Sequence, residues 1–557
     1  MRTGDCTLDA CDAGEAVMAR ACPEAPAEFR DMLAMFRACV DEAPSRTAVA
    51  YFDTALTYAQ IDRASDRAAV WLIDHGVVRG DRVAMILQNM PQSLMALVAA
   101  WKIGAIPVPG NPAYRAAELS RVFADCAPRA IVCLAENVET VRIAGGMAGI
   151  APAILVASAR GLQQRHDARV IPDAEPTPDL PLLERIVAAP ASPAVPDVTL
   201  DGDEIGLILY TSGTTGEPKG AMIRHRSLAF NGQSMRDLCG LSGSSRILGI
   251  APLFHITGMS CHVAAALSAR ATLVLHYRVE PTLLLDVIRE HRPTFTIGAI
   301  TAFNALMNVP GIGAEDMRGF DRIYSGGAPV PPALLEELAR RLGVRIHTAY
   351  GMTETTAQTH IAPFGATIPV DPQSGSLSIG KLTPLTAARI VDGEGRDVAD
   401  GEQGELLIRG PQIMAGYWNK PAQTAAALAD GWMHTGDVAV RDADGWYYLV
   451  DRIKDCIIAS GFKVWPREVE DALYTHGAVR EAAVVGVPDP YRGETVKAFI
   501  SLRPGAAATP DDLIAHSRTL LAAYKVPRVV EIMDELPKTV TGKIQRHVLR
   551  ESERSQV

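Results

Sequence analysis

The stretch LILYTSGTTGEPKG, residues 207–220, is the most informative segment for the fold of this chain. Its apolar first half predicts a strand, and the following residues, 211–220, combine glycines, hydroxyl side chains and Lys219 in one loop. Such a loop offers many N–H, O–H and ammonium donors, which the oxygens of a polyphosphate require. The spacing differs from a Walker A loop, because Gly213 and Gly216 are too close together and a glycine follows the lysine. The segment therefore predicts a phosphate-binding loop after a strand and argues against a P-loop kinase.

Strand-like and helix-like runs alternate on both sides of this segment, across residues 36–129 and again across 205–361. The alternation predicts a parallel sheet covered by helices, and hence an α/β fold. Seven prolines within residues 170–200 indicate a surface connection between the two halves. Short strands with Gly/Asp turns across residues 380–450 predict a small antiparallel unit.

A change of pattern near Arg452 predicts a domain boundary. After Lys454 the chain shows a compact succession of short helices and strands. A length of 557 residues also exceeds what one hydrophobic core usually serves. We therefore expect two domains, residues 1–451 and residues 452–557.

Composition excludes several classes of protein. Apolar residues make up 48 % of the chain and charged residues 21 %, which is typical of folded rather than disordered proteins. The net charge of −10 argues against nucleic-acid binding. The nine cysteines form no CxxC pair, which favours reduced thiols over disulfides or a zinc site. We found no signal-peptide core or membrane-spanning segment, so the sequence predicts a cytoplasmic protein with no integral membrane segment.

Four further motifs contain groups suited to a nucleotide and follow the loop in order. The five motifs are TSGTTGEPKG at 211–220, YGMTE at 350–354, HTGD at 434–437, DRIKD at 451–455 and PKTVTGKIQR at 537–546. Together they resemble the adenylate-forming (AMP-binding) superfamily, in particular acyl-CoA synthetases and fatty-acid–CoA ligases. The resemblance extends from about Thr57 to Arg550. It implies a large N-terminal AMP-binding and acyl-binding domain of layered β-sheets with helices plus a small β-barrel, and a small mobile α/β C-terminal domain.

The resemblance implies a nucleotide site built from many segments. The residues it implicates are Thr211, Ser212, Gly213, Thr214, Thr215, Gly216 and Lys219 around the phosphates, Gly326, Gly327 and Ala328 against adenine and the acyl group, Tyr350, Gly351 and Met352 at the base, Asp437 and Arg452 at the ribose, Lys454 at the domain hinge, and Gly461 beside the pantetheine arm of CoA. Small residues such as Gly326 allow a flat ligand to approach the backbone closely.

Four residues are predicted to act in catalysis. Attack of a carboxylate on the α-phosphate brings two anions together, and Lys543, in a glycine-flanked loop, can stabilise the charge that develops. By resemblance, Thr353 contacts the α-phosphate and Glu354 binds Mg²⁺, a cation that prefers carboxylate and phosphate oxygens. His255, in PLFHITGM, corresponds to a family position beside the acyl site that gates it.

The sequence thus predicts an acid–thiol ligase that uses ATP, Mg²⁺ and CoA to convert a small-molecule carboxylic acid into its CoA thioester. The apolar surroundings of Ile300, Phe303 and Ala328 favour a fatty-acid-like substrate. An aryl or alicyclic acid, and a carrier-protein thiol or amine as the acceptor, remain alternatives, as does a nucleotide-binding regulator without catalysis. The oligomeric state stays open, with a homodimer as one candidate.

Overall fold

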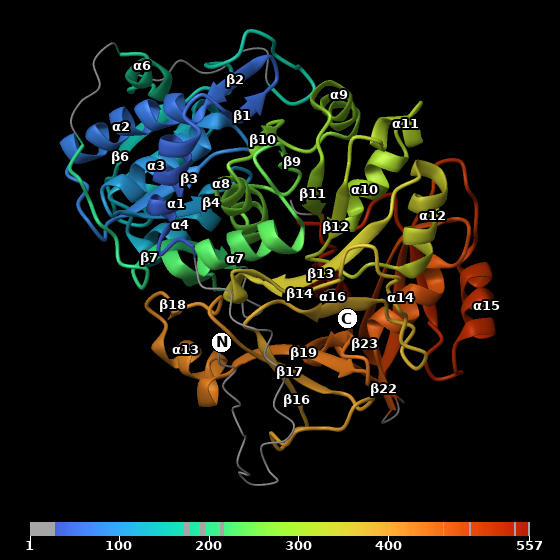
Figure 1. Cartoon of the computed structure of the whole chain (residues 1–557). Coiled ribbons are helices and arrows are strands. Elements are labelled where there is room, and N and C mark those ends of the chain that lie inside the picture. Colours follow the sequence, from blue (N-terminus) through green and yellow to red (C-terminus); the bar gives the residue numbers. More distant parts are fainter. Residues whose placement is uncertain are drawn as a thin grey trace, which may run out of the picture.

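The computed structural model describes residues 28–171, 179–189, 195–211, 217–459, 462–489, 492–539 and 542–554. Their elements form the α/β fold expected from the strand–helix alternation. Figure 1 shows the blue and green N-terminal elements above the orange strands, with the red C-terminal elements at the right.

A four-stranded parallel sheet forms the first layer, in the order β4-β3-β5-β6. All five residues of β5 are buried, as expected for a parallel strand covered on both faces. Its strands and the helices between them are β3 (Arg82–Ile86), α3 (Pro91–Lys102), β4 (Ile106–Gly110), α4 (Ala116–Cys126), β5 (Ala130–Leu134), α5 (Val138–Met147) and β6 (Ala153–Ala157). The alternation of strands and helices predicted across residues 36–129 is confirmed here.

A thirteen-stranded sheet runs through the molecule in the order β16-β17-β19-β20-β15-β14-β13-β12-β11-β9-β10-β1-β2. The middle strands, from β1 to β13 in this order, are parallel to one another, and both ends of the sheet are antiparallel. The strands of the parallel part and the outer end are β1 (Thr47–Tyr51), β2 (Thr54–Thr57), β9 (Arg246–Leu248), β10 (Thr272–Leu275), β11 (Phe295–Gly298), β12 (Arg322–Ser325) and β13 (Ile346–Met352).

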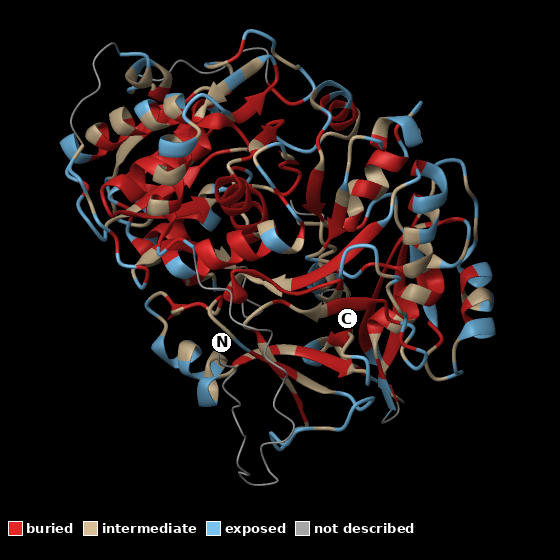
Figure 2. Cartoon of the chain, viewed as in Figure 1, coloured by how far each residue is buried: buried red, intermediate tan, exposed pale blue. Residues whose placement is uncertain are grey.

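The other helices of the large domain connect or flank the strands of these sheets. They are α1 (Met32–Glu42), α2 (Tyr58–Asp74), α6 (Leu183–Val187), α7 (His225–Leu238), the π-helical η2 (Gly258–Ala264), α8 (Ala265–Ala269), α9 (Pro281–His291), α10 (Ile300–Met307), α11 (Ala314–Met317) and α12 (Pro332–Leu342). Helix α2 begins at a capping box in which Thr57 and Gln60 exchange hydrogen bonds. Buried residues are concentrated in the sheets and in the helix faces against them (Figure 2).

The predicted antiparallel unit is present, but its strands extend the large sheet. It contains β15 (Ser378–Leu382), β16 (Ala387–Val391), β17 (Gly404–Arg409), β19 (Met433–Arg441) and β20 (Tyr447–Arg452), and β14 (Ala357–Ile361) joins it to β13. Among the described residues these strands do not close into the expected small barrel, because β15 pairs with β14 on one side and β20 on the other. Pairing with β14 makes them part of an open sheet.

A third, three-stranded sheet carries the phosphate-loop segment, in the order β18-β8-β7. Strands β7 (Ile205–Thr211) and β8 (Lys219–Arg224) pair antiparallel, and the two-residue β18 (Gly416–Tyr417) adds to β8 from a distant part of the chain. Helix α13 (Pro421–Ala427) follows β18. The strand predicted before the loop is confirmed as β7.

The C-terminal segment forms a separate α/β domain with its own sheet and core. Its elements are β21 (Ile457–Ala459), β22 (Phe462–Val464), α14 (Pro466–Tyr474), β23 (Val479–Asp489), β24 (Gly493–Leu502), α15 (Pro510–Leu520), β25 (Val529–Ile532) and α16 (Arg546–Arg554). Strands β23 and β24 form a long antiparallel pair, and β25 runs parallel to β24. The compact α/β pattern expected after Lys454 is therefore confirmed.

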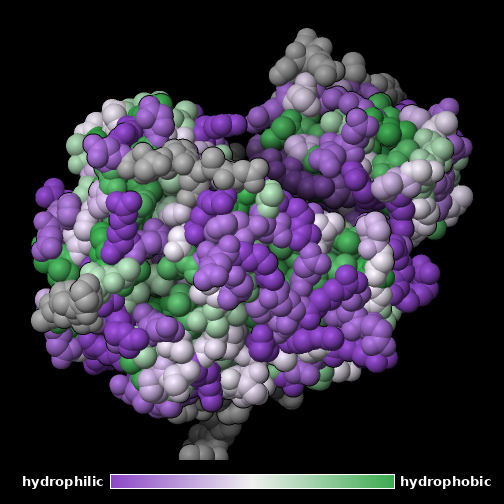
Figure 3. Space-filling model, turned by 90° about the horizontal axis from the view of Figure 1, so that it is seen from above, coloured by the Kyte–Doolittle hydropathy of each residue, from purple (hydrophilic) through white to green (hydrophobic). Residues whose placement is uncertain are grey.

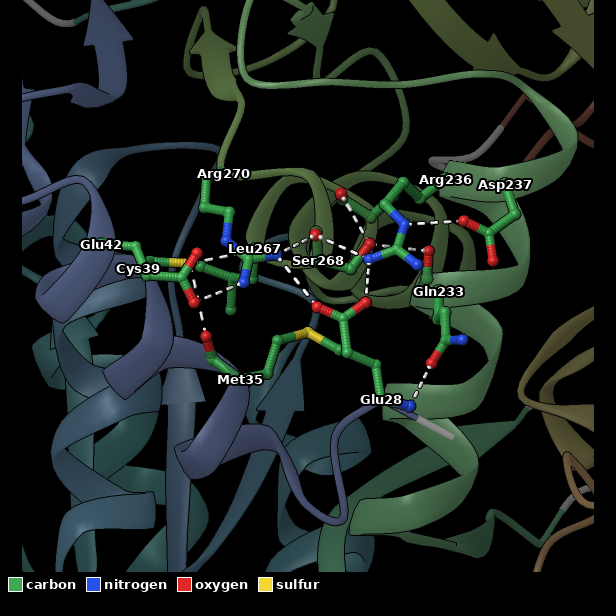
Figure 4. A network of polar contacts seen from close by, with 12 residues as sticks. Glu28, Met35, Cys39, Glu42, Gln233, Arg236, Asp237, Leu267, Ser268 and Arg270 are labelled. Carbon is green, nitrogen blue, oxygen red and sulfur yellow. Dashed lines mark hydrogen bonds and ion pairs between the residues drawn. The ribbon is translucent and has the colours of Figure 1, made fainter. Parts of the chain in front are cut away.

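A polar network ties the start of the described chain to the helices of the large domain (Figure 4). Arg236 in α7 and Arg270 at the end of α8 both form ion pairs with Glu28. Arg270 also donates to Glu42 at the end of α1, at 2.8 Å, and Arg236 to the carbonyl of Ser268. The network fixes α1 against α7 and α8, the helices that flank the π-helical segment η2.

The surface seen from above is largely polar, with apolar side chains in separate small areas, and it is hollowed between a smaller lobe and the main body (Figure 3).

The six described cysteines are all free thiols, which confirms the expectation of unpaired cysteines for this part of the chain.

The C-terminal domain is docked on the large domain through a bidentate ion pair. Arg503 donates to both carboxylate oxygens of Glu337 in α12, at 2.7 and 2.8 Å. A cleft of about 390 Å³ lies beside this pair, between α10 and α12 on one side and the segment from α14 to β23 on the other. The loop before α16 touches α10, because a Cβ added at Gly542 would lie 2.1 Å from Thr301 Oγ1.

We predict that the Arg503–Glu337 pair holds the two domains together. An Arg503→Glu variant should be cut about two- to fivefold faster after Lys454 by a lysine-specific protease, the range expected for a partly exposed ion pair. Adding Glu337→Arg should restore the slow rate. Arg318→Ala, which breaks the exposed ion pair between Arg318, directly after α11, and Glu315 within it, serves as the control. Equal cleavage rates for all variants would contradict the prediction.

Candidate functional site

Three of the predicted site residues follow the carboxyl ends of the central parallel strands. His255 follows β9, Gly326 follows β12, and Glu354 follows β13. The N-terminus of α10, after β11, lies at the same edge. Because parallel strands all point the same way, residues far apart in sequence meet at one edge of the sheet, where α/β folds bind their ligands. The 542–543 loop reaches this edge through its contact with α10.

The phosphate-loop segment is a β-hairpin whose two ends are in register. Thr211 at the end of β7 pairs with Lys219 at the start of β8. The ammonium of Lys219 lies 5.3 Å from the centre of the Tyr417 ring, within cation–π range. Five predicted residues, Ser212, Gly213, Thr214, Thr215 and Gly216, lie outside the described residues, as does Gly461.

A tight turn after β13 presents Glu354. A Cβ on Gly351 would lie 1.7 Å from the carbonyl oxygen of Ala357, so only glycine fits there. Thr356 and Ala357 both have positive φ, at 51° and 84°, a left-handed conformation that such residues rarely adopt. The turn places Glu354 in a 3₁₀ helix, η3 (Thr353–Thr355), with Met352 as its N-cap residue.

The carboxylate of Glu354 is buried and hydrogen-bonded. Tyr417 donates its hydroxyl to Glu354 Oε1 at 2.8 Å. Burial, reinforced by this carboxylate, raises the pKa of the Tyr417 phenol far above its ordinary value, so it remains a donor. Nothing in the sequence distinguishes Tyr417 from an ordinary core aromatic, and the sequence analysis missed it.

Asp437 contacts two other predicted site residues, Tyr350 and Arg452. Tyr350 donates to Asp437 Oδ2 at 2.6 Å, and Arg452 Nε lies 3.2 Å from Oδ1. Burial, followed by the charge of Asp437, holds the pKa of Tyr350 well above its usual value. The register of β19 with β20 places Asp437 opposite Arg452.

The turn between β12 and α12 requires glycine for reasons of backbone packing and conformation. A Cβ on Gly326 would lie 2.6 Å from the carbonyl oxygen of Ala349 in β13, and Gly327 has a φ of +79°. This close approach places Gly326 next to β13, the strand that contains Tyr350.

Lys543 lies in this site, half-buried, among charged groups. Burial and the cation of Arg452 lower the pKa of Lys543 to about 8, against the opposing effect of Asp437. Burial and the ammonium of Lys543 lower the pKa of His255 to about 4, so this imidazole is neutral at pH 7. Lys543 therefore lies within electrostatic range of Arg452, Asp437 and His255.

The loop that carries Lys543 is held from both ends. Thr539 and Lys543 exchange hydrogen bonds across a turn with Gly542 at a φ of +80°. Three residues later, Arg546 donates to Glu470 Oε1 at 2.9 Å and to Asp451 Oδ1 at 3.0 Å. Arg546 therefore links the loop to α14 and to the last residues of β20. It belongs to a quoted motif, yet its role was not foreseen from the sequence.

Lys454, the predicted hinge residue, is exposed in the short helix η5 (Ile453–Asp455) directly after β20. It therefore lies in the segment that joins the large sheet to the C-terminal domain.

The described residues contain no group of three His, Cys, Asp or Glu side chains able to enclose a metal ion. One buried carboxylate, Glu354, with Oε1 already accepting a hydrogen bond, fits a cation that takes most of its ligands from phosphate oxygens and water. Mg²⁺ in nucleotide sites is bound in this way.

Comparison with known proteins decides the family. The model of the AMP-binding enzyme matches residues 36–418, and that of the AMP-binding enzyme C-terminal domain matches residues 468–543. This chain belongs to the AMP-binding enzyme family. The family resemblance inferred from the motifs is confirmed.

Known proteins similar to this chain include CoA ligases that act on different acids. It is 34 % identical to a long-chain-fatty-acid–CoA ligase of Bacillus subtilis, over 92 % of both chains. It is 35 % identical to a feruloyl-CoA synthase of Amycolatopsis, over 91 % of this chain and 96 % of the relative. A benzoate CoA ligase structure from Burkholderia xenovorans LB400 superposes with a TM-score of 0.82 at 27 % identity, over 94 % of this chain and all of that one.

The chain is thus an enzyme of the adenylate-forming acyl-CoA ligase family, whose members use ATP, Mg²⁺ and CoA. The acid is not determined by this membership, since these relatives differ in it. Within the described residues, no helix has the length and apolar character needed to cross a membrane.

The surroundings of Lys543 predict an unusual titration. Competitive acylation of lysines, quantified by mass spectrometry, should show half-maximal reactivity of Lys543 near pH 8 in the folded protein. In denaturant the same residue should titrate above roughly pH 10, as free lysines do. Arg452→Ala should move the folded midpoint upward, because it removes a neighbouring cation. A folded midpoint equal to the denatured one would disprove this account of the site.

Proposed function

We propose that this enzyme activates a carboxylic acid as its acyl-adenylate and transfers the acyl group to CoA. The observation that carries the proposal is the position of the Lys543 loop: Gly542 contacts Thr301 in α10, and the ammonium of Lys543 lies within electrostatic range of Asp437, Arg452 and His255. A cation at this place is suited to a step in which two anions must meet.

In the first step, an oxygen of the substrate carboxylate attacks the α-phosphorus of ATP and pyrophosphate leaves. Lys543 stabilises the negative charge that gathers on the carboxylate and the α-phosphate, and Thr353 donates to an α-phosphate oxygen. Glu354 would hold Mg²⁺, which neutralises charge on the phosphate oxygens. His255, neutral at pH 7, borders the acyl group without adding a second cation.

The remaining residues bind and orient the nucleotide. Asp437 accepts from the ribose hydroxyls and Arg452 adds a cation beside it, while Tyr350 faces the base. The phosphates lie on the loop from Thr211 to Lys219, including Ser212, Gly213, Thr214, Thr215 and Gly216. Gly326, Gly327, Ala328, Gly351 and Met352 supply backbone surface that adenine can approach closely.

In the second step, the CoA thiol attacks the acyl carbon and AMP leaves, so the thioester replaces a mixed anhydride. We propose that the domain boundary lies between residues 451 and 452 and that the C-terminal domain turns about Lys454 between the steps. That rotation would withdraw Lys543 and bring the face around Gly461 to the acyl-adenylate. Since ATP and CoA are intracellular substrates, we propose a cytoplasmic location.

We propose an apolar, fatty-acid-like acid as the substrate. Support comes from the buried, apolar Ile300 and Phe303 in α10, next to the loop of Lys543, and from the long-chain ligases among the relatives. The feruloyl-CoA and benzoate-CoA enzymes make an aryl acid the second candidate.

Acid-dependent exchange of ATP with pyrophosphate, measured over aliphatic, alicyclic and aryl acids of graded size, tests the substrate class. Mass detection of the product with and without CoA distinguishes a thioester from transfer to an amine or a carrier protein. Exchange with none of the acids would disprove the proposed function.

Lys543→Ala should lose acid-dependent pyrophosphate release by a factor of about 100 or more, because a charge-stabilising group is lost from the transition state. Thioester formation from supplied acyl-adenylate should persist, because Lys543 leaves the site before that step. Lys381→Ala, at a lysine in β15 bonded to the carbonyl of Asp444, is the control and should keep both activities. Unchanged pyrophosphate release by Lys543→Ala would refute the role of this residue.

A further inference from the structure

Tyr417 contacts two of the groups assigned to the phosphates, although it lies far from both in sequence. Its hydroxyl donates to Glu354 Oε1 at 2.8 Å, and its ring lies 5.3 Å from the ammonium of Lys219. The side chain is 7 % exposed, so surrounding atoms restrict its rotamer. The Tyr417 side chain therefore contacts both Lys219 at the end of the phosphate loop and Glu354 in the turn after β13.

The backbone around Tyr417 bridges the same two elements. Met414 donates its amide to the carbonyl of Glu354 at 2.9 Å, and Ala415 donates to Met222 in β8 at 2.8 Å. Tyr417 pairs with Ala221, and Trp418 donates to the carbonyl of Gly220 at 2.8 Å. The segment from 414 to 418 is therefore bonded to the turn at one end and to β8 at the other.

The far side of this segment is also fixed. Thr424 in α13 accepts the amide hydrogen of Tyr417 at 2.8 Å, and Lys420 forms an ion pair of 3.3 Å with Glu217, at the end of the phosphate loop. The site of Tyr417 is thus braced by α13 as well as by β8.

We propose that Tyr417 is a positioning residue that sets the separation of Lys219 and Glu354, and through Glu354 the binding of Mg²⁺ with the nucleotide. Among the described residues, Oε1 of Glu354 accepts from Tyr417 alone, which leaves Oε2 for the cation. An anchored carboxylate loses less rotational freedom on binding a cation than a free one. The inference rests on the proposed function.

Calorimetric titration of ATP binding at graded Mg²⁺ concentrations tests this role without any acid or CoA. Tyr417→Phe keeps the ring and removes the hydroxyl. It should raise the Mg²⁺ concentration for half-maximal ATP binding by roughly 3- to 10-fold, as expected for one lost hydrogen bond, and should leave ATP binding without Mg²⁺ unchanged. Tyr417→Leu also removes the ring and should weaken ATP binding without Mg²⁺ by roughly 2- to 5-fold, because Lys219 loses its aromatic partner.

Tyr448→Phe is the matched control. Tyr448, in β20, is similarly buried and donates to Asp442 Oδ2 at 2.7 Å, outside the site. This variant should keep the wild-type Mg²⁺ dependence. In the Glu354→Gln background, Tyr417→Phe should have little further effect, because it acts through the carboxylate.

Three results would overturn the inference: an unchanged or lowered Mg²⁺ midpoint in Tyr417→Phe, an equal shift in Tyr448→Phe, or a full additional shift in the Glu354→Gln background. Each is read from ATP binding. A protein that binds ATP with Mg²⁺ but activates no acid would instead disprove the proposed function alone.

Discussion

The buried carboxylate of Asp437 is the contact on which the arrangement of the site depends. It receives the hydroxyl of Tyr350 from the central sheet and the guanidinium of Arg452 at the end of β20, and it counteracts the effect of burial on Lys543. A buried carboxylate without partners is unfavourable, so each of these donors is held in place by the need to satisfy it. The carboxylate of Asp437 therefore acts both on residues of the large sheet and on Lys543 of the C-terminal domain.

The position of the Lys543 loop depends on a second set of buried charges. Arg546 is surrounded by Asp451, Asp455 and Glu470, and Arg550 pairs with Asp455 at 3.0 Å. Burial raises the pKa of Glu470, while the neighbouring Arg546 opposes this effect. Since these acids come from β20, η5 and α14, the loop of Lys543 is fixed relative to the segment proposed as the hinge. The pairs with Asp455 and Glu470 lie within the C-terminal domain, whereas the pair with Asp451 crosses the proposed boundary to the last strand of the large sheet.

Much of the fold could be predicted from local patterns. The strand before the phosphate loop, the helices α3 and α4, and the order of elements after Lys454 all follow from periodicity within a few residues. The small barrel was wrongly expected, because whether strands close or extend a neighbouring sheet depends on the pairing of β14 with β15. Prediction of the site is limited in the same way, by pairing between distant segments. Glu354 and Lys543 lie in recognisable motifs, whereas Tyr417 acquires its role only when β18 pairs with β8, across about 200 residues of chain.

The pair of Arg503 with Glu337 has a consequence for the surroundings in which the enzyme works. Its guanidinium is about one-third exposed, and dissolved ions weaken attractions between accessible charges over about 8 Å at physiological ionic strength. The enclosed charges around Arg546 are shielded much less. Rising electrolyte concentration therefore weakens this contact between the two domains more than it weakens the buried ion pairs of Arg546 beside the Lys543 loop.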